Sequence, residues 1–488
     1  MRKEVWFGLS IMAAVVIGVF ILMPAPSAMS SGHVGLLMLG LIVVAIMLGF
    51  PTAFTLMGMG VIFTWIAYHG ADPQTATRQT LDLMVQRAYA VMSNDVLISI
   101  PLFVFMGIVL ERSKIAEDLL VTLGQSFGRL PGGLGYSVAI VGALLAASTG
   151  IVGATVVTMG LISYPAMMRS GYDQRLASGI ITASGTLAQL IPPSTVLILI
   201  GTFLQNANSQ VQAAKGNYAA TPVTVVEIFV AALVPGLLLV AIYLLWILYI
   251  AITDPKRCPP VLMDAEEKRT FQVRIWKAIV PPLALIVAVL GSILSGAATA
   301  TESAAVGAMG ALLLAAMRGK VSVDSMRHVC QGSLSMSTMI FTILIGAAVF
   351  SLVFRGLGGE KVAEDVLTAL PGGAAGATFA VLLLMFVLGF FIDTFEIVFI
   401  VVPIFGPVLL KIGVDPIWLA VMMGMVLQTS YLTPPFGFAI FYLQGVARDL
   451  PIQAIYRGVV PFVVLQLVGC ALVWFWPTIA TWLPKILL

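Results

Sequence analysis

Two carboxylates interrupt an apolar stretch in the last quarter of the chain. Asp393 and Glu396 stand between the apolar runs 383–392 and 397–402, with Thr394 beside them. A charge at the centre of a bilayer costs about 3 kcal/mol even on the lenient insertion scale, so it normally has a partner or a function. A carboxylate at a helix break is a hard oxygen ligand for a cation, although a protonated, structural Asp393 is the alternative. The stretch predicts an ion and substrate site at mid-membrane.

Double prolines interrupt two other apolar segments. Pro434 and Pro435 follow the polar side chains of Gln428, Thr429 and Thr433. A proline removes a backbone donor and breaks the helix, which frees carbonyl groups that can bind a cation. Pro192 and Pro193 form the earlier double proline, and a set of hydroxyl residues accompanies it: Ser148, Thr149, Ser184, Thr186 and Ser194. Such hydroxyls often bond back to their own helix, which is the competing interpretation.

The composition is that of a polytopic membrane protein. Of 488 residues, 60% are hydrophobic and 10% are charged, and the mean hydropathy is +1.06, which is more apolar surface than a soluble domain of this size needs. The net charge of +3 is small and dispersed, so we expect no nucleic-acid partner. The scattered cysteines and histidines form no metal-binding pattern, and there is no phosphate-binding GxxxxGK[ST] loop. We expect sodium as the only metal, no cofactor and no catalytic residues.

Apolar runs predict an all-α protein with many membrane segments. The first run, 6–23, follows Arg2 and Lys3 and ends near Pro24; a cleaved signal peptide is possible, but we favour a retained span. The other runs lie at about 34–49, 52–68, 95–110, 134–165, 176–206, 226–251, 277–295, 298–317, 334–354, 375–411, 416–447 and 459–484. The mixed segments 111–130 and 355–370 are expected to lie as interfacial helices.

Four of these runs are interrupted in a particular way. The runs 134–165 and 375–411 are too long for one crossing and too short for two, and both have a polar or glycine-rich middle. This pattern fits a re-entrant hairpin, whose tip is tolerated only where protein or water surrounds it. The double prolines predict broken helices at 176–206 and 416–447.

The interruptions recur at a fixed distance, which indicates an internal duplication. Five pairs are separated by 242 residues: Pro165 and Pro407, Gly171 and Gly413, Asp173 and Asp415, Pro192 and Pro434, Pro193 and Pro435. The loop 251–278 has six basic residues, the densest basic cluster of the chain, and is placed in the cytoplasm. Counting spans outward from it makes the two hairpins enter from opposite sides, so the repeats are inverted, as in secondary transporters. We divide the chain into an extra span (1–33), repeat 1 (34–251), a cytoplasmic connection (252–276) and repeat 2 (277–488).

From about residue 34 onward, the chain resembles the large membrane subunit of tripartite ATP-independent periplasmic (TRAP) transporters. The resemblance rests on five stretches: 100–103 with Gly107, 148–160, 184–186 with 191–194, 301–307, and Asp393 with 433–435. It implies an elevator fold in the bacterial inner membrane, with a transport domain that slides within a scaffold. It also implies sodium sites at the hairpin tips, a small four-helix membrane subunit, and a periplasmic binding protein that delivers an organic acid.

The resemblance, added to the polar clusters, assigns the expected site residues. The expected sodium ligands are Ser148, Thr149, Gly150, Ser184, Gly185, Thr186, Asp393, Thr394, Thr429 and Thr433. The expected substrate-binding residues are Gly153, Thr155, Pro192, Pro193, Ser194, Glu396, Pro434 and Pro435. Because no Lys or Arg stands at mid-membrane, helix N-termini of the hairpins are expected to bind the carboxylate of the substrate.

The sequence therefore predicts the permease subunit of a sodium-coupled importer of small organic acids. The first tip has fewer serines than the family pattern, and the second carries Glu396, which that pattern lacks. These departures favour 2-oxo or hydroxy monocarboxylates over C4-dicarboxylates. A channel, a symporter or antiporter that works without a binding protein, and an intramembrane enzyme are the alternatives; no nucleophile–base pair supports the last.

Overall fold

The computed structural model describes residues 29–69, 73–128, 130–219, 222–261 and 265–487, with scattered residues between 10 and 23. The predicted first span at 6–23 and the choice between a span and a signal peptide lie outside the residues described continuously. Within the described ranges the regular structure is all helical, as expected. These residues group into two compact units, which are interleaved in the sequence.

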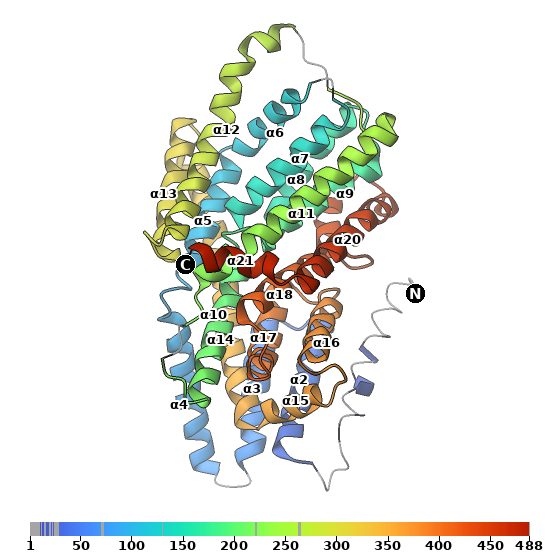
Figure 1. Ribbon diagram of the computed structural model, residues 1–488. Coiled ribbons are helices and arrows are strands. Elements are labelled where there is room, and N and C mark those ends of the chain that lie inside the picture. Colours follow the sequence, from blue (N-terminus) through green and yellow to red (C-terminus); the bar gives the residue numbers. More distant parts are fainter. Residues whose placement is uncertain are drawn as a thin grey trace. The chain divides into compact units, whose positions relative to one another are not determined.

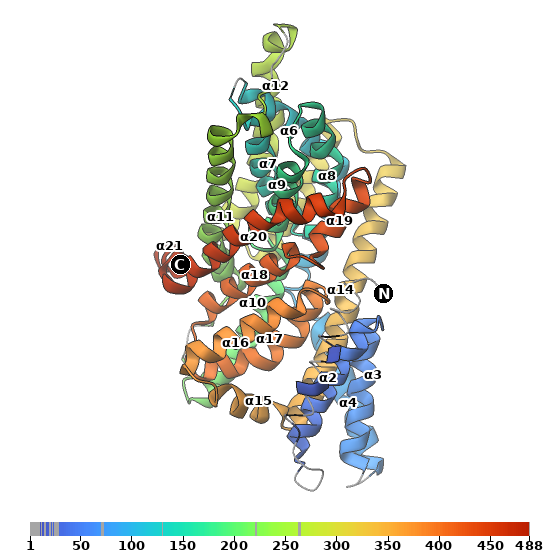
Figure 2. The ribbon, with the colours of Figure 1, turned by 90° about the vertical axis from the view of Figure 1, so that its right-hand side faces the viewer.

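The first unit contains residues 1–95, 203–222 and 337–416. Its helices are α2 (Ser31–Met47), α3 (Thr52–His69), α4 (Pro73–Met92), α15 (Gly359–Thr368), α16 (Gly373–Leu388) and α17 (Thr394–Lys411), with the C-terminal parts of α10 (Thr195–Ala214) and α14 (Val323–Gly356). Close backbone approach joins α3 to α14, because a Cβ added to Gly346 would lie 2.7 Å from the carbonyl oxygen of Ala53. In Figure 2, α16 and α17 run side by side, and they are in contact.

The second unit contains residues 96–202, 223–336 and 417–488. Its first helices are α5 (Ser99–Arg112), α6 (Ile115–Ser126), α7 (Gly133–Thr149), α8 (Val152–Arg169), α9 (Gln174–Thr186) and the 3-10 turn η2 (Leu187–Gln189). The later ones are α11 (Val225–Thr253), η3 (Pro255–Arg257), α12 (Ala265–Leu294), α13 (Ala300–Met317), α18 (Pro416–Leu432), α19 (Phe438–Val446), α20 (Ile452–Phe475) and α21 (Thr478–Leu487). Figure 1 shows α7, α8 and α9 packed together.

Glycines set the closest helix contacts of this unit. An added Cβ on Gly179 of α9 would lie 2.2 Å from the carbonyl oxygen of Gly458 on α20, so the two backbones touch. An added Cβ on Gly307 of α13 would lie 2.6 Å from the sulfur of Met106 on α5. Only a residue without a side chain allows such approach. Gly307 belongs to the 301–307 stretch that carried part of the resemblance, and its role is to pack α13 against α5.

The interrupted runs are divided into helices at the predicted places, while the re-entrant path of the two hairpins in the membrane stays a prediction. The run 134–165 forms the helix pair α7 and α8, and 375–411 forms α16 and α17. The double prolines separate α9 from α10 and α18 from α19. The segments expected as interfacial helices contain α6 and α15, and α15 meets α16 at a bend of 116°. Their placement at a membrane surface stays a prediction.

Two parts of the reading by hydropathy are wrong. The run 459–484 is two helices, α20 and α21, because the first ends before Trp476 and Pro477. Residues 73–92 form a full helix, α4, which the apolar runs did not include because its sequence is rich in Gln, Thr and Arg. By length and composition, six described helices are able to cross a membrane, or seven if the bent pair α15–α16 counts as one span.

Candidate functional site

The first hairpin turns between its helices in two residues. Gly150 ends α7 in the left-handed region, with φ +60°, and Ile151 is extended before α8 begins at Val152. A left-handed residue at a helix C-terminus is usually glycine, because a side chain there meets the following backbone. Gly150 is thus required by the turn itself, before any ligand is considered.

This tip lies directly against the first double proline. A Cβ added to Gly150 would lie 2.9 Å from the carbonyl oxygen of Pro193. The hydroxyl of Thr195 donates to the carbonyl of Gly150 at 2.8 Å and closes the contact from the other side. The structure therefore brings together the tip and the helix break that the sequence predicted as parts of one site.

Buried hydroxyl groups surround the tip. Ser148 and Thr149 both donate to the carbonyl of Leu145 at 2.9 Å, and the hydroxyl oxygens of Thr149 and Thr155 lie 2.7 Å apart. All three side chains are buried. These bonds within the helices are what the structural interpretation expected. A hydroxyl that donates its proton still offers its lone pairs, so the same geometry leaves oxygens able to bind a cation.

Helix α9 supplies the next polar group through two close contacts. An added Cβ on Gly142 of α7 would lie 2.5 Å from Cβ of Ser184, and one on Gly185 would lie 2.4 Å from the side chain of Val156 on α8. Ser184 and Thr186 donate to carbonyls of their own helix at 2.7 and 2.8 Å. The glycines thus bring the hydroxyls of α9 against both helices of the hairpin.

A serine side chain bridges the interruption after α9 with hydrogen bonds. The hydroxyl of Ser194 donates to the carbonyl of Gln189 at 2.8 Å and accepts from the N–H of Leu197 at 3.4 Å. This residue spans the interruption that Pro192 and Pro193 create. Both double prolines contain a cis peptide bond.

The first turn of α8 is the expected substrate-binding element of this unit. Its Gly153 faces α19, because an added Cβ would lie 3.2 Å from the ring of Tyr442. The first N–H groups of a helix have no partner within that helix and favour an anion. A larger residue at position 153 would meet the tyrosine, so this glycine lets the ring of Tyr442 pack against the first turn of α8.

The second hairpin tip belongs to the first unit and has different chemistry. Five residues, 389–393, separate α16 from α17. Asp393 is the N-cap of α17, and its carboxylate accepts from the N–H of Phe395 at 3.4 Å. Thr394 is buried, and the carboxylate of Glu396 accepts a hydrogen bond from the hydroxyl of Thr52 on α3. Glu396 therefore has a hydrogen-bond donor within the protein; its contact with a substrate stays a prediction.

The second helix break belongs to the other unit. Thr429 donates to the carbonyl of Met425 at 2.8 Å, and Thr433 donates to the carbonyl of Thr429 at 2.7 Å. The hydroxyl of Tyr456 donates to the carbonyl of Pro435 at 2.9 Å. One carbonyl oxygen at this double proline is therefore already hydrogen-bonded within the protein. A shared site of these residues with Asp393 and Thr394 stays a prediction.

Two other acidic residues have structural roles. Glu302 and Thr299 form a capping box at the start of α13, with the N–H of Thr299 donating to Glu302 at 2.8 Å. Glu227 and Thr224 form the same arrangement at the start of α11, where that N–H bond is 2.7 Å long. A capping box satisfies two helix N–H groups that otherwise have no partner. Glu302, which belongs to the 301–307 stretch, therefore caps the N-terminus of α13.

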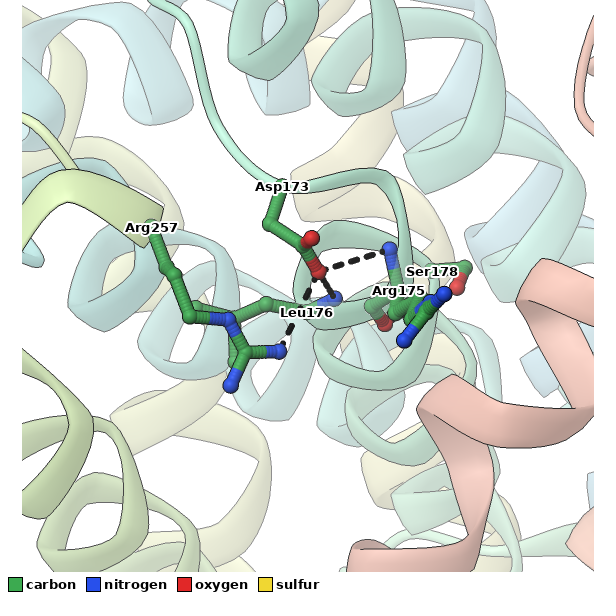
Figure 3. Close-up of polar contacts among 5 residues, drawn as sticks. All are labelled: Asp173, Arg175, Leu176, Ser178 and Arg257. Carbon is green, nitrogen blue, oxygen red and sulfur yellow. Dashed lines mark hydrogen bonds and ion pairs between the residues drawn. The ribbon is translucent and has the colours of Figure 1, made fainter. Parts of the chain in front are cut away.

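A charged contact fixes the loop between α8 and α9, outside the hairpin tip. Figure 3 shows Asp173 at the start of α9, where it accepts from the N–H groups of Arg175 and Leu176, both at 3.0 Å, and pairs with Arg257 at 3.2 Å. Partial burial raises the pKa of Asp173, but the bonds from Leu176, Arg257 and Arg175 outweigh it and hold the pKa below its ordinary value. The loop is therefore anchored by a carboxylate that is ionised near neutral pH.

Three contacts were not foreseen from the sequence. Thr195 bonds to the hairpin tip, and its place directly after Pro193 and Ser194 was an available signal. Thr52 bonds to Glu396 across 344 positions, and no local pattern shows such a pair. Gln466 is the only amide side chain in the apolar run 459–484 and bonds to two other helices; a lone amide in an apolar run was its signal.

Comparison with known proteins identifies the family of this chain. The model of the family described as "Tripartite ATP-independent periplasmic transporter, DctM component" matches residues 39–479. The chain belongs to this family. It is a transport subunit and a multi-pass protein of the bacterial inner membrane, and the resemblance read from the motifs is confirmed.

Relatives of this DctM-family chain include large permease proteins of TRAP transporters. The chain is 28% identical over 446 residues to an ectoine/5-hydroxyectoine TRAP transporter large permease protein of Ruegeria pomeroyi, covering 90% of this chain and 96% of that one. It is 28% identical over 459 residues to a C4-dicarboxylate TRAP transporter large permease protein of Rhodobacter capsulatus, covering 93% and 99%. The fold is similar to that of the YdaH transporter of Alcanivorax borkumensis, with a TM-score of 0.59, 13% identity, and coverage of 85% and 90%.

Proposed function

We propose that this chain is the permease subunit of a sodium-coupled secondary transporter that imports small organic acids by an elevator movement. A periplasmic binding protein delivers the substrate, and a small four-helix membrane subunit completes the scaffold. The proposal rests on membership of the DctM family and on the chemistry of the two hairpin tips.

One observation carries the sodium assignment. The tip at Gly150 lies against the carbonyl of Pro193, with the hydroxyls of Thr149 and Thr155 buried beside it. These are hard, neutral oxygens, the kind of ligand that alkali and alkaline-earth cations prefer. A tip that contacts a broken helix supports a site that forms only when the hairpin is closed.

The N-terminal turn of α8 is the proposed binding element for the carboxylate of the substrate. It begins at Val152, immediately after the tip, so a carboxylate there would lie close to the sodium oxygens. A bound cation favours a neighbouring anion by Coulomb attraction, which is stronger in a medium of low dielectric constant. This gives a physical reason for coupling between sodium and substrate.

The proposed substrate class rests on the chemistry of the second tip. Relatives are described as permeases for ectoines, C4-dicarboxylates, isethionate and sialic acid, so family membership alone does not select among acids. Glu396 at the second tip is a hydrogen-bond acceptor and repels a second carboxylate. We therefore favour a monocarboxylate with a hydroxyl or oxo group over a C4-dicarboxylate.

The test is uptake by liposomes that contain the chain with its membrane partner and binding protein. Uptake of a labelled hydroxy acid is measured under a sodium gradient and, separately, under a proton gradient. We expect uptake with sodium only. Equal uptake when potassium replaces sodium contradicts the sodium coupling, and full uptake without the binding protein contradicts the tripartite mechanism.

A further inference from the structure

Four polar side chains meet inside the second unit, away from the hairpin tip. They are Thr186 on α9, Tyr243 on α11, Gln428 on α18 and Gln466 on α20. None of them is more than 1% exposed. Four different helices therefore contribute a polar group to the same buried position in a protein whose interior is otherwise mostly apolar.

The carboxamide of Gln466 is the centre of this cluster. Its Nε2 donates to the hydroxyl of Thr186 at 3.2 Å and to the hydroxyl of Tyr243 at 2.7 Å. Nε2 of Gln428 approaches the same tyrosine oxygen at 3.5 Å. The bonds form an unbranched chain in the order Thr186, Gln466, Tyr243, Gln428, which we call the polar chain.

The two ends of the polar chain are equivalent positions of the duplication. Thr186 and Gln428 are separated by 242 residues, the same distance that separates the two double prolines. Each stands in the last part of a helix that a double proline interrupts. The polar chain thus joins the broken helix of repeat 1 to the broken helix of repeat 2.

Both ends also adjoin expected sodium ligands. Thr186 is itself an expected ligand, and its hydroxyl donates to the carbonyl of Ala183, so the bond from Gln466 fixes where its oxygen points. Gln428 directly precedes Thr429, the expected ligand of the second repeat. A shift of either broken helix changes the length of the bonds in the polar chain.

The central tyrosine is held in place by packing. The ring of Tyr243 makes an edge contact with Phe462, with 5.5 Å between the ring centroids. Phe462 lies one helical turn before Gln466 on α20, so the same helix holds the ring and bonds its hydroxyl. The position of the hydroxyl is therefore set by α20 rather than by a free rotation of the side chain.

The cluster is costly to bury, which argues against a role in stability alone. The Oε1 atoms of Gln428 and Gln466 have no hydrogen-bond partner within the described part of the chain. A buried amide oxygen without a partner is unfavourable, and an apolar replacement of similar shape often packs equally well. Polar groups kept at such a cost are expected where a specific arrangement is needed.

We propose that Gln466 is a positioning residue that couples the sodium responses of the two repeats through Tyr243. It orients the oxygen of Thr186 at one end. At the other end it holds the hydroxyl of Tyr243, which bonds Gln428 and so limits the position of the helix that carries Thr429. The inference rests on the proposed sodium coupling. Neither Gln466 nor Tyr243 binds the ion in this account.

The experiment compares three variants of the full chain assembled with its partners. Gln466→Met keeps the length of the side chain without its donors, and Tyr243→Phe removes one oxygen and keeps the ring. Thr182→Val is the matched control, because Thr182 is equally buried on α9 but bonds only to carbonyls of its own helix. Sodium is titrated against uptake and against the thermal unfolding midpoint of the purified complex.

We expect the half-saturating sodium concentration to rise about tenfold in Gln466→Met and about threefold in Tyr243→Phe, the size of one hydrogen-bonding interaction lost or weakened. The sodium dependence should also become less steep, since the sites are uncoupled. Thr182→Val should leave the sodium titration unchanged, because its hydroxyl has no bond to another helix. If Gln466→Met does not assemble, Tyr243→Phe decides the question.

Two results overturn the inference, and they differ. Variants that are less stable but have the sodium titration of the unmodified protein make the polar chain purely structural. An unmodified protein that does not respond to sodium at all contradicts the proposed function, and the inference with it.

Discussion

The two hairpins share a backbone plan but differ in the chemistry of their tips. The first turns at Gly150 and Ile151 and is surrounded by hydroxyl groups, without a carboxylate in the turn. The second turns over residues 389–393 and ends on Asp393, with Glu396 one turn further on. A displacement of 242 residues from Asp393 leads to Ile151. The duplication therefore kept the helix breaks, and the charge is present at one tip only.

The difference indicates a division of roles between the repeats. A site of neutral oxygens binds a cation without contributing charge, whereas a carboxylate ligand contributes a negative charge that the cation neutralises. We therefore expect the proposed sodium coupling to depend on charge most strongly at the second tip. Substitutions that remove charge or shape from one tip at a time test this division.

The largest expected effect is that of Asp393→Asn. Asparagine keeps the shape and one oxygen but removes the charge, which should cost roughly 1.5–3 kcal/mol of ion binding, the range for a charged hydrogen bond. That is a rise of about tenfold or more in half-saturating sodium. The measurement is uptake against sodium concentration, after expression and assembly have been checked.

Ser148→Ala and Thr149→Ala are the counterparts at the first tip. Both hydroxyls already donate to the carbonyl of Leu145, and backbone oxygens remain as ligands after each substitution, so the sodium shifts should be smaller than that of Asp393→Asn. Wild-type sodium dependence in Asp393→Asn would mean that the carboxylate is structural, and the comparison of the two tips would lose its basis.

The next effect concerns the shape of the first tip. Gly150→Ala places a side chain at φ +60° and 2.9 Å from the carbonyl of Pro193. The left-handed conformation alone costs about 1–2 kcal/mol, so we expect a lower unfolding midpoint and a large loss of uptake. Gly389→Ala is the control at the second hairpin, because Gly389 has φ −63° and alanine adopts that conformation freely. Equal effects of the two substitutions would show that the tight turn is not special.

Sequence patterns could predict the hairpins and breaks but not what they touch. Proline, glycine and polar residues in apolar runs act locally, and this is why α7–α8, α16–α17 and the interruptions at both double prolines were located correctly. The bond from Thr52 to Glu396 and the polar chain around Gln466 depend on which helices pack together. Hydropathy also passed over α4, since a helix with many polar residues gives no apolar run.

A smaller effect separates the two carboxylates of the second tip. Thr52→Val removes the donor to Glu396 and should destabilise the protein by about 1 kcal/mol, the net value of a typical hydrogen bond. Half-saturating sodium should change by less than about twofold, because Asp393 is untouched. The measurements are the unfolding midpoint and the sodium titration. A sodium shift as large as that of Asp393→Asn would instead make Glu396 part of the ion site.

The smallest expected effect is that of Asp173→Asn, which tests whether a charge outside the first hairpin tip influences sodium binding. Asp173 lies in the loop after the first hairpin, paired with Arg257 (Figure 3), and not at the tip. Asp173→Asn keeps the helix cap, since Asn and Asp cap equally well, and removes an ion pair between partly exposed groups, worth about 0.2–1 kcal/mol.

Because the folded protein holds the pKa of Asp173 below its ordinary value, the stabilisation is present above the unfolded pKa of about 3.9 and is lost as the pH falls through the lower, folded pKa. The unfolding midpoints of Asp173→Asn and the unmodified protein should therefore differ at pH 7 and converge below about pH 4, while half-saturating sodium stays the same. A sodium shift in Asp173→Asn would mean that the charge of the first repeat acts on the ion from outside the tip, and the division between a neutral and a charged hairpin would fail.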